Sequence, residues 1–115
     1  MPTIVIFEDE PYWAPELRRQ FLENDSVRVR HCQVVGSVPV ASASDVLLVS
    51  LDRRERECLE LLRQVSGYFV IFIGSESTAD LERPFREAGV HSFLTQTLSG
   101  EELARRIQLV WAAPV

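Results

Sequence analysis

Three short apolar runs constrain the fold of this chain more than any other feature of its sequence. Residues 3–7, 46–49 and 68–73 are nearly continuous apolar segments, rich in β-branched and aromatic side chains. They lack the alternation of a half-exposed strand, so they predict strands covered on both faces, as in a parallel sheet. An alternating segment at residues 27–30 indicates an edge strand, and residues 92–95 form a weaker fifth candidate.

Helical spacing lies between these strands. Trp13, Leu17 and Phe21 recur every four residues, and the apolar residues of segments 58–65 and 103–111 keep helical spacing too. Strands that alternate with helices predict right-handed βαβ units around one parallel sheet. Five strands predict an α/β, flavodoxin-like (βα)5 fold with strand order 2-1-3-4-5, in which ligands bind beyond the carboxyl ends of the strands.

Prolines and a short connection mark where the helices depart from this pattern. Residues 36–44 lie between the second and third strands, contain a proline and allow at most one helical turn. The second helix is therefore expected to be shortened. Pro84 should make the fourth helical segment start near Arg83 or kink there. Pro11 and Pro15 both suit the first turn of the first helix.

The composition suits one soluble domain, so residues 1–115 are expected to form a single unit. The net charge of −5, from 12 basic and 17 acidic side chains, argues against nucleic acid as a partner. No apolar run could span a bilayer and no secretory signal is visible, so a cytoplasmic location without membrane contact is expected. Cys32 and Cys58 lack metal-type spacing and are expected to be free and buried.

Polar residues follow four of the five predicted strands, where parallel strands bring their carboxyl ends to one edge of the sheet. These strand-end segments are Glu8-Asp9-Glu10, Ser50-Leu51-Asp52, Gly74-Ser75 and Thr95-Gln96-Thr97. Every basic residue is arginine, so no mechanism that needs a lysine is open to the chain. No histidine is expected at a strand end, the two histidines being His31 and His91, and no nucleophile–base pair is visible. The chain is therefore not expected to be an enzyme.

The order of these strand ends resembles the receiver domains of bacterial response regulators. That family places an acidic pair after strand one and a phospho-accepting aspartate at the end of strand three. A Ser or Thr follows strand four, and a Lys-Pro pair follows strand five. Two segments set the register, Leu-Glu-Leu-Leu-Arg at residues 59–63 and Ala-Gly-Val-His-Ser-Phe-Leu-Thr-Gln-Thr at residues 88–97. The resemblance covers essentially the whole chain.

Three positions keep the residue types that this family uses. The resemblance assigns Glu8 and Asp9 to the metal-binding pair, and Phe93 to the aromatic position on strand five that turns inward. Carboxylates suit Mg²⁺, so the pair is expected to bind this ion weakly, and no other cofactor is expected. Acidic residues ahead of a helix also stabilise its positive end, so helix capping is the alternative role for this segment.

The other positions have lost the family's residue types. The resemblance places the phosphoacceptor on Ser50, the switch hydroxyl on Gly74 with Ser75 beside it, and the lysine on Gln96. A serine hydroxyl is a far poorer nucleophile than a carboxylate. These residues, together with Asp52, are interpreted as a vestigial phosphorylation pocket.

The resemblance therefore implies a pseudo-receiver that binds a protein partner in bacterial signal transduction without being phosphorylated. The family's output face would be drawn from residues 80–96 and the outer side of residues 103–111. Arginine and aromatic residues tend to carry interface energy, which favours Arg83, Arg86 and Phe93 as anchors. A homodimer through the same face is also compatible with the resemblance.

Two alternatives remain open. A phosphorylatable regulator could use Asp52, which in an extended strand points to the same face as Ser50. That carboxylate could equally cap the helix that begins near Arg54. A small-molecule sensor could bind an anion or a nucleotide in the vacated pocket, although an acidic pocket without lysine disfavours bare anions. Trp13 is expected to be half buried at the pocket mouth, where an aromatic ring could also stack on a ligand.

Overall fold

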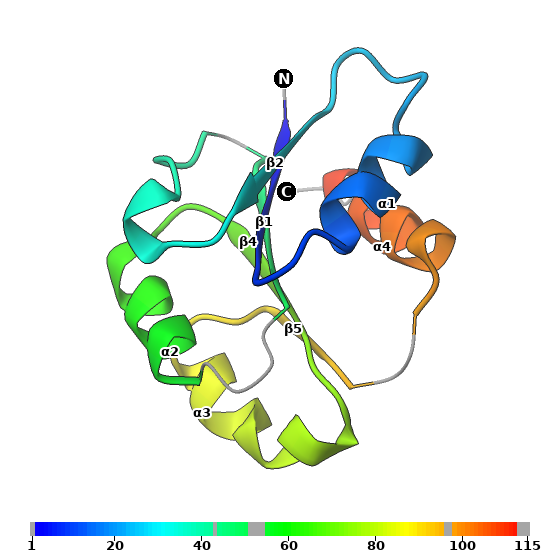
Figure 1. The fold of residues 1–115 in the computed structure, drawn as a ribbon. Coiled ribbons are helices and arrows are strands. Elements are labelled where there is room, and N and C mark those ends of the chain that lie inside the picture. Colours follow the sequence, from blue (N-terminus) through cyan, green and yellow to red (C-terminus); the bar gives the residue numbers. More distant parts are fainter. Residues whose placement is uncertain (1, 43, 51–54, 96–97, 113–115) are drawn as a thin grey trace.

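A five-stranded parallel sheet forms the centre of the computed structural model, which describes residues 2–42, 44–50, 55–95 and 98–112 (Figure 1). The strand order is β2-β1-β3-β4-β5, and every described pair of neighbours is parallel. This confirms the fold class and the strand order expected from the sequence. The strands are β1 (Thr3–Glu8), β2 (Arg28–Cys32), β3 (Val46–Ser50), β4 (Phe69–Ile73) and β5 (Ser92–Leu94).

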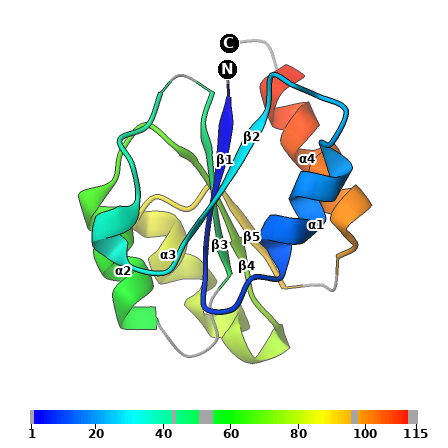
Figure 2. The same ribbon diagram turned by 45° about the horizontal axis from the view of Figure 1, so that its top comes forward.

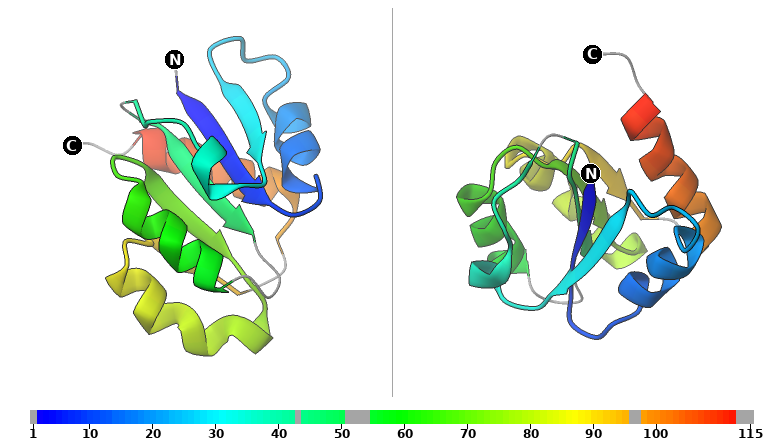
Figure 3. Two further views of the ribbon diagram at one scale, coloured as in Figure 1. Left: turned by 60° about the vertical axis from the view of Figure 1, so that its left-hand side comes forward. Right: turned by 90° about the horizontal axis from the view of Figure 1, so that it is seen from above.

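Helices cover both faces of the sheet, so the molecule has three layers (Figure 2). Helices α1 (Trp13–Gln20) and α4 (Gly100–Ala112) lie on one face. Helices α2 (Glu55–Gln64) and α3 (Glu82–Glu87) lie on the other, with α3 preceded by the 3₁₀ segment η2 (Glu76–Leu81). A single 3₁₀ turn, η1 (Val35–Ser37), replaces the second helix, as the shortened connection predicts (Figure 3). None of the described helices is both long and apolar enough to cross a bilayer.

The central strands are buried on both faces, which explains their unbroken apolar sequence. Residues 4–7 of β1 and 46–49 of β3 are completely enclosed. Ile4 and Ile6 contribute to the core under α1 and α4, whereas Val5 and Phe7 contribute to the core under α2 and α3. Successive side chains of one strand therefore enter two different cores, and polar residues are excluded from both positions.

The prolines fall where helix geometry tolerates them, with one exception to the prediction. Pro84 is the third residue of α3, and Pro15 is the third residue of α1. In the first turn of a helix the backbone N–H groups have no helical partner, so a proline costs little there. Pro11 lies ahead of α1, which begins at Trp13, so its placement in the helix was wrong.

Both cysteines are free and buried, as predicted. Cys58 of α2 is completely enclosed, and burial together with the nearby charge of Glu55 raises the pKa of its thiol from 9.0 to about 12. The unfolded chain would ionise this thiol near pH 9, before the folded protein can. The stability that depends on the neutral thiol is therefore present below pH 9 and is lost as the pH rises towards 12.

We expect neither cysteine of the folded protein to react with iodoacetamide at neutral pH, because the reactive species is the exposed thiolate. Intact mass should show no added group in native buffer and two added groups after the same treatment in concentrated urea, since the chain has two cysteines. Rapid labelling of Cys58 in the folded protein would contradict the packing of α2 against the sheet.

Candidate functional site

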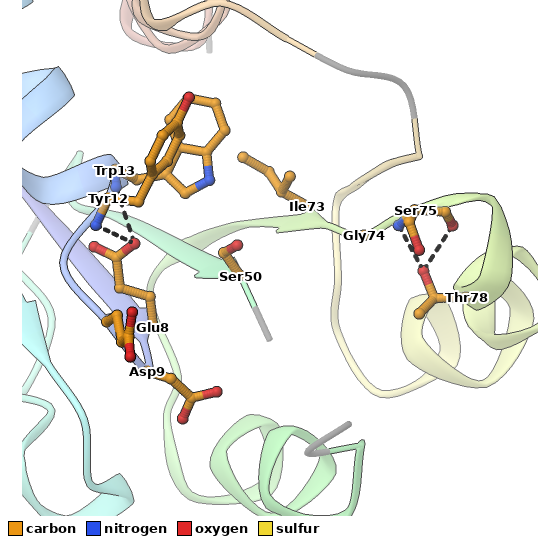
Figure 4. Close-up of a pocket in the computed structure, with 10 residues that line it drawn as sticks. Glu8, Asp9, Tyr12, Trp13, Ser50, Ile73, Gly74, Ser75 and Thr78 are labelled. Atoms are coloured by element: carbon orange, nitrogen blue, oxygen red, sulfur yellow. Dashed lines mark hydrogen bonds between the residues drawn. The ribbon is translucent and has the colours of Figure 1, made fainter. Parts of the chain in front are cut away.

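The carboxyl ends of β1, β3 and β4 surround a hollow of about 330 Å³ (Figure 4). In the sheet register, Ser50 is the Cα partner of Glu8 on one side and of Ile73 on the other. Five residues of the predicted pocket line this hollow: Glu8, Asp9, Ser50, Gly74 and Ser75. The other two, Asp52 and Gln96, lie outside the described residues.

Glu8 is buried and its carboxylate holds the start of α1. Its Oε1 atom accepts hydrogen bonds from the backbone N–H groups of Tyr12 (3.1 Å) and Trp13 (2.9 Å), and its Oε2 atom accepts one from Ala14 (3.0 Å). Only 3% of the residue is exposed. The first N–H groups of a helix have no partner inside the helix, and the negative charge also suits its positive end. The geometry therefore favours the capping role over the metal-binding role.

The two residues of the expected metal-binding pair have different surroundings. Both oxygens of Glu8 are already engaged, whereas Asp9 is exposed. No group of three or more His, Cys, Asp or Glu residues in the described parts of the chain is placed to hold a metal ion. A divalent ion at Glu8 would have to displace the hydrogen bonds to α1. Weak Mg²⁺ binding by Glu8 and Asp9 stays a prediction.

Gly74 stands where the resemblance places the switch hydroxyl, and a steric constraint explains why a glycine is present. A Cβ atom added at Gly74 would collide with Oγ1 of Thr78 and would lie 2.8 Å from the ring of Phe72. The Thr78 hydroxyl thus fills the space beside Gly74. It accepts a hydrogen bond from the N–H of Ser75 and donates one to the carbonyl of Ser75, both at 2.9 Å. Sequence reasoning missed Thr78, because only the path of η2 brings it back to the strand end.

Two aromatic residues form one wall of the site. Trp13 is 7% exposed, more buried than predicted, and it lines the hollow from the first turn of α1. Tyr12 is 60% exposed and stands edge-on to Trp13, with ring centroids 5.0 Å apart and planes at 89°. Sequence patterns did not identify Tyr12, because the residue lies in a loop without periodicity. Its backbone is fixed by the hydrogen bond to Glu8.

A second, wider hollow of about 1120 Å³ continues from the first towards β5 and α4. The two hollows share Tyr12, Trp13, Ile73, Gly74 and Ser75, and the second adds Glu76, Ser77, Thr95 and Leu98. We call the two together the strand-end groove. Its position at the carboxyl edge of the sheet is the one expected for ligands of a doubly wound fold.

Comparisons with known proteins identify this fold. No model of a protein family matches the chain, and no curated protein matches its sequence. The chain is similar to the crystal structure of the CpaE2 pilus assembly protein of Sinorhizobium meliloti, with a TM-score of 0.63 and 17% identity over 96% of this chain and 99% of that one. It is also similar to a bacteriophytochrome response regulator, with a TM-score of 0.59 and 21% identity over 99% and 94% of the two chains. The chain has the receiver fold.

In this receiver fold, the aromatic residue of β5 is packed inward. Phe93 is 8% exposed and stacks on Phe72, with ring centroids 4.9 Å apart and planes at 15°. Phe85 of α3 packs edge-on against both rings. This inward position agrees with the role that the resemblance gives Phe93. Its burial leaves the ring little surface for a partner, and a role for Phe93 as an interface anchor stays a prediction.

The two arginines of the predicted output face are exposed on α3. Arg83 pairs with Glu87 at 3.3 Å, and Arg86 pairs with Glu82 at 2.7 Å. Arg86 also donates a hydrogen bond to the carbonyl of His91, which joins α3 to the start of β5. Exposed pairs one helical turn apart contribute little to stability. Their role in contacting a partner stays a prediction.

A histidine of the edge strand lies beside Glu8, which the sequence did not predict. Strand β2 continues to Cys32, so His31 belongs to the sheet beside Ile6 of β1. Its Nε2 atom lies 3.8 Å from Oε2 of Glu8 and is buried without a hydrogen-bond partner among the described residues. The expectation that no histidine lies near a strand end was therefore wrong.

The capping role of Glu8 can be separated from a metal-binding role by its effect on stability. Glu8→Gln should lower the free energy of unfolding by about 2–4 kcal/mol, because a neutral amide cannot accept all three backbone hydrogen bonds. Urea unfolding without metal measures this, with Glu10→Gln as the exposed control that should leave stability unchanged. A metal pocket predicts the opposite sign, since removing one of two repelling carboxylates stabilises the metal-free protein.

Proposed function

We propose that this chain is a pseudo-receiver, a domain of the receiver fold that binds a protein partner in bacterial signal transduction without being phosphorylated. The observation that carries the proposal is the residue at the end of β3. The sheet register places Ser50 between Glu8 and Ile73, at the edge where the family's phosphoacceptor carboxylate is expected. A serine hydroxyl needs an activating base to act as a nucleophile. Among the described residues, no hydrogen bond joins Ser50 to a histidine or carboxylate side chain.

The charge of the groove supports the proposal. Phosphoryl transfer depends on cations that neutralise the transferred group. The chain contains no lysine, and no arginine or histidine lines either hollow in the described parts of the chain. The Glu8 carboxylate is engaged with α1, so it is poorly placed to bind the Mg²⁺ ion that would supply positive charge. Among the described residues, a phosphoryl group in this groove would meet carboxylates and no cationic side chain.

The packing around the switch positions supports a domain with one resting conformation. The ring of Phe93 is held between β4 and α3, and the Thr78 hydroxyl is held by the backbone of Ser75. A conformational change requires an agent that binds the two states with different affinity. Without covalent phosphate, that agent is a partner. One similar structure is a response regulator and the other a pilus assembly protein, which supports a role in signalling or assembly through protein contacts.

We expect no acyl phosphate to form on this protein. Incubation with acetyl phosphate and Mg²⁺, followed by intact mass at acid pH, should show no added phosphoryl group, because the acceptor carboxylate and the lysine are both missing from the family's positions. A conventional phosphorylatable receiver treated in parallel supplies the positive control. An adduct that disappears in the Asp52→Asn variant would instead make the chain a phosphorylatable regulator.

Restoring the carboxylate alone should harm the protein. Ser50→Asp should lower the free energy of unfolding at neutral pH by about 1–3 kcal/mol. Two like charges ~4 Å apart repel by about 4 kcal/mol at an effective dielectric of 20 and by about 1 kcal/mol in bulk water. Adding Gln96→Lys should recover part of the loss, and millimolar Mg²⁺ should recover part by binding only the folded form.

Urea unfolding of these variants with and without Mg²⁺ measures the effect, and Ser66→Asp, an exposed serine outside the groove, serves as the matched control. Equal stability of wild type and Ser50→Asp at neutral pH without metal would show that a carboxylate at position 50 does not lie close to those of Glu8 and Asp9.

A further inference from the structure

The outer edge of β2 presents backbone groups that no described strand uses. The N–H of Arg28 donates to the carbonyl of Pro2 at 3.1 Å, so the backbone groups of Arg28 face β1. Successive residues of a strand turn their backbone groups to opposite sides, so those of Val29 and His31 point outward. The carbonyl of Val29 agrees with this direction, because it accepts a hydrogen bond from the guanidinium group of Arg18 at 3.5 Å. Such an open edge is a template for another strand (Figure 3).

Two arginines lie along this open edge. Arg28 and Arg30 are both exposed, and because they are two residues apart their side chains share one side of β2, about 6–7 Å from each other. Neither guanidinium group forms a hydrogen bond or an ion pair with a described residue. Arg19 and Arg86, by contrast, each pair with a glutamate of their own helix. Charge complementarity therefore calls for carboxylates at alternate positions of a segment that pairs with β2.

The shortened connection after β2 explains why these arginines are uncovered. Cys32 shares their side of the strand and packs in the core under α2 and α3, so the arginines point to that face of the sheet. There the single turn η1 replaces the second helix. Val29 points to the opposite face, where it is partly buried against the core under α1 and α4. An extended segment that alternates acidic and aliphatic residues would match both sides of the edge.

We propose that β2 accepts an extended acidic segment of the protein partner as an additional strand of the sheet. The backbone of that segment pairs with the outward groups of Val29 and His31, and its alternate carboxylates pair with Arg28 and Arg30. The inference rests on the proposed function, since it names the contact chemistry of that partner.

Two other occupants fit this edge less well. A second copy of this chain that paired β2 with β2 would place arginines beside arginines, and like charges on adjacent strands are destabilising. A polyanion such as nucleic acid would meet a net charge of −5 and would leave the backbone groups of the edge unpaired. A peptide backbone that carries carboxylates satisfies both requirements of the edge.

Amide hydrogen exchange of the free protein checks that the edge is open. The N–H groups of Arg28 and Arg30 face β1 and should exchange slowly, whereas those of Val29 and His31 should exchange rapidly. Equal protection of all four amides would overturn the inference, because no backbone group would then be free to pair with a partner.

The binding test uses the peptide acetyl-Glu-Val-Glu-Val-Glu-amide, titrated into ¹⁵N-labelled protein. We expect saturable shifts of the Val29 and His31 amide signals, with a dissociation constant on the order of millimolar, and slower exchange of both amides. The amides of β5, at the opposite edge of the sheet, supply the internal reference and should not move. The glutamine analogue of the peptide has nearly the same shape without the charge and should bind much more weakly.

Two N-methylated versions of the peptide isolate the backbone pairing. One carries methyl groups on the nitrogens of its two valines, and the other on those of its last two glutamates, so both keep the same charge. Only alternate N–H groups of an added strand face β2, so one version should lose binding and the other should keep it, whichever direction the strand takes. If both versions bound as the parent peptide does, charge alone would hold the peptide, and strand addition would be overturned.

Matched variants isolate the two arginines. Arg28→Gln with Arg30→Gln should weaken the peptide roughly fivefold to tenfold, as expected for two exposed ion pairs. The control, Arg56→Gln with Arg63→Gln, removes the same charge from exposed positions of α2 and should bind as wild type does. Unchanged affinity of the Arg28→Gln, Arg30→Gln variant would overturn the assignment of the acidic segment to this edge.

The outcomes separate this inference from the proposed function. Unmoved Val29 and His31 signals, or equal binding of the glutamine analogue, would each overturn the inference about β2. Beryllofluoride with Mg²⁺, added to separate samples of the same protein, mimics a phosphoryl group. A saturable response of the strand-end residues to this mimic would overturn the proposed function. Silence towards the mimic together with silence towards the peptide would overturn the inference about β2 alone.

Discussion

The hydrogen bonds between the Glu8 carboxylate and the first turn of α1 fix the geometry on which the groove depends. A buried carboxylate is costly unless its charge is offset, and three backbone N–H groups at the positive end of a helix offset it. Because these bonds reach Tyr12 and Trp13, the same interaction sets the aromatic wall of the groove. The carboxylate that the resemblance assigns to metal binding therefore holds the start of α1 in this receiver fold.

The sheet could be predicted because burial on both faces leaves a mark in the sequence. Residues 4–7 and 46–49 must fill two cores at once, so only apolar side chains fit there, whichever way the helices pack. The end of β2 was less predictable. The strand extends to Cys32, two residues beyond the expected boundary, and so brings His31 beside Glu8. Cys32 breaks the alternation, because it is 3% exposed and packs in the core. An edge strand signals its exposed positions, not its length.

The sequence predicted the location of the site better than the role of each side chain in it. Strand order alone brings Glu8, Ser50 and Gly74 to one edge, because parallel strands end together. The role of each side chain depends on contacts that spacing does not encode. The Thr78 hydroxyl returns to the space beside Gly74 through the turn of η2, and the Glu8 carboxylate turns towards α1 instead of the solvent. A position-by-position comparison therefore has no means of finding the Thr78 hydroxyl beside Gly74.

The two main departures from the family's pattern are physically coupled. A carboxylate at Ser50 beside Glu8 and Asp9 needs a cation, and a lysine at Gln96 needs carboxylates to offset it. Losing either residue alone leaves an unbalanced charge at the strand ends, whereas losing both removes the anion-binding chemistry and keeps the charge tolerable. What remains among the described residues is a groove lined by carboxylates and a Phe93 ring already packed inward. In the proposed pseudo-receiver, a shift between two conformations therefore requires a ligand that binds them with different affinity. On the proposed function, the output of the domain therefore depends on which partner is present.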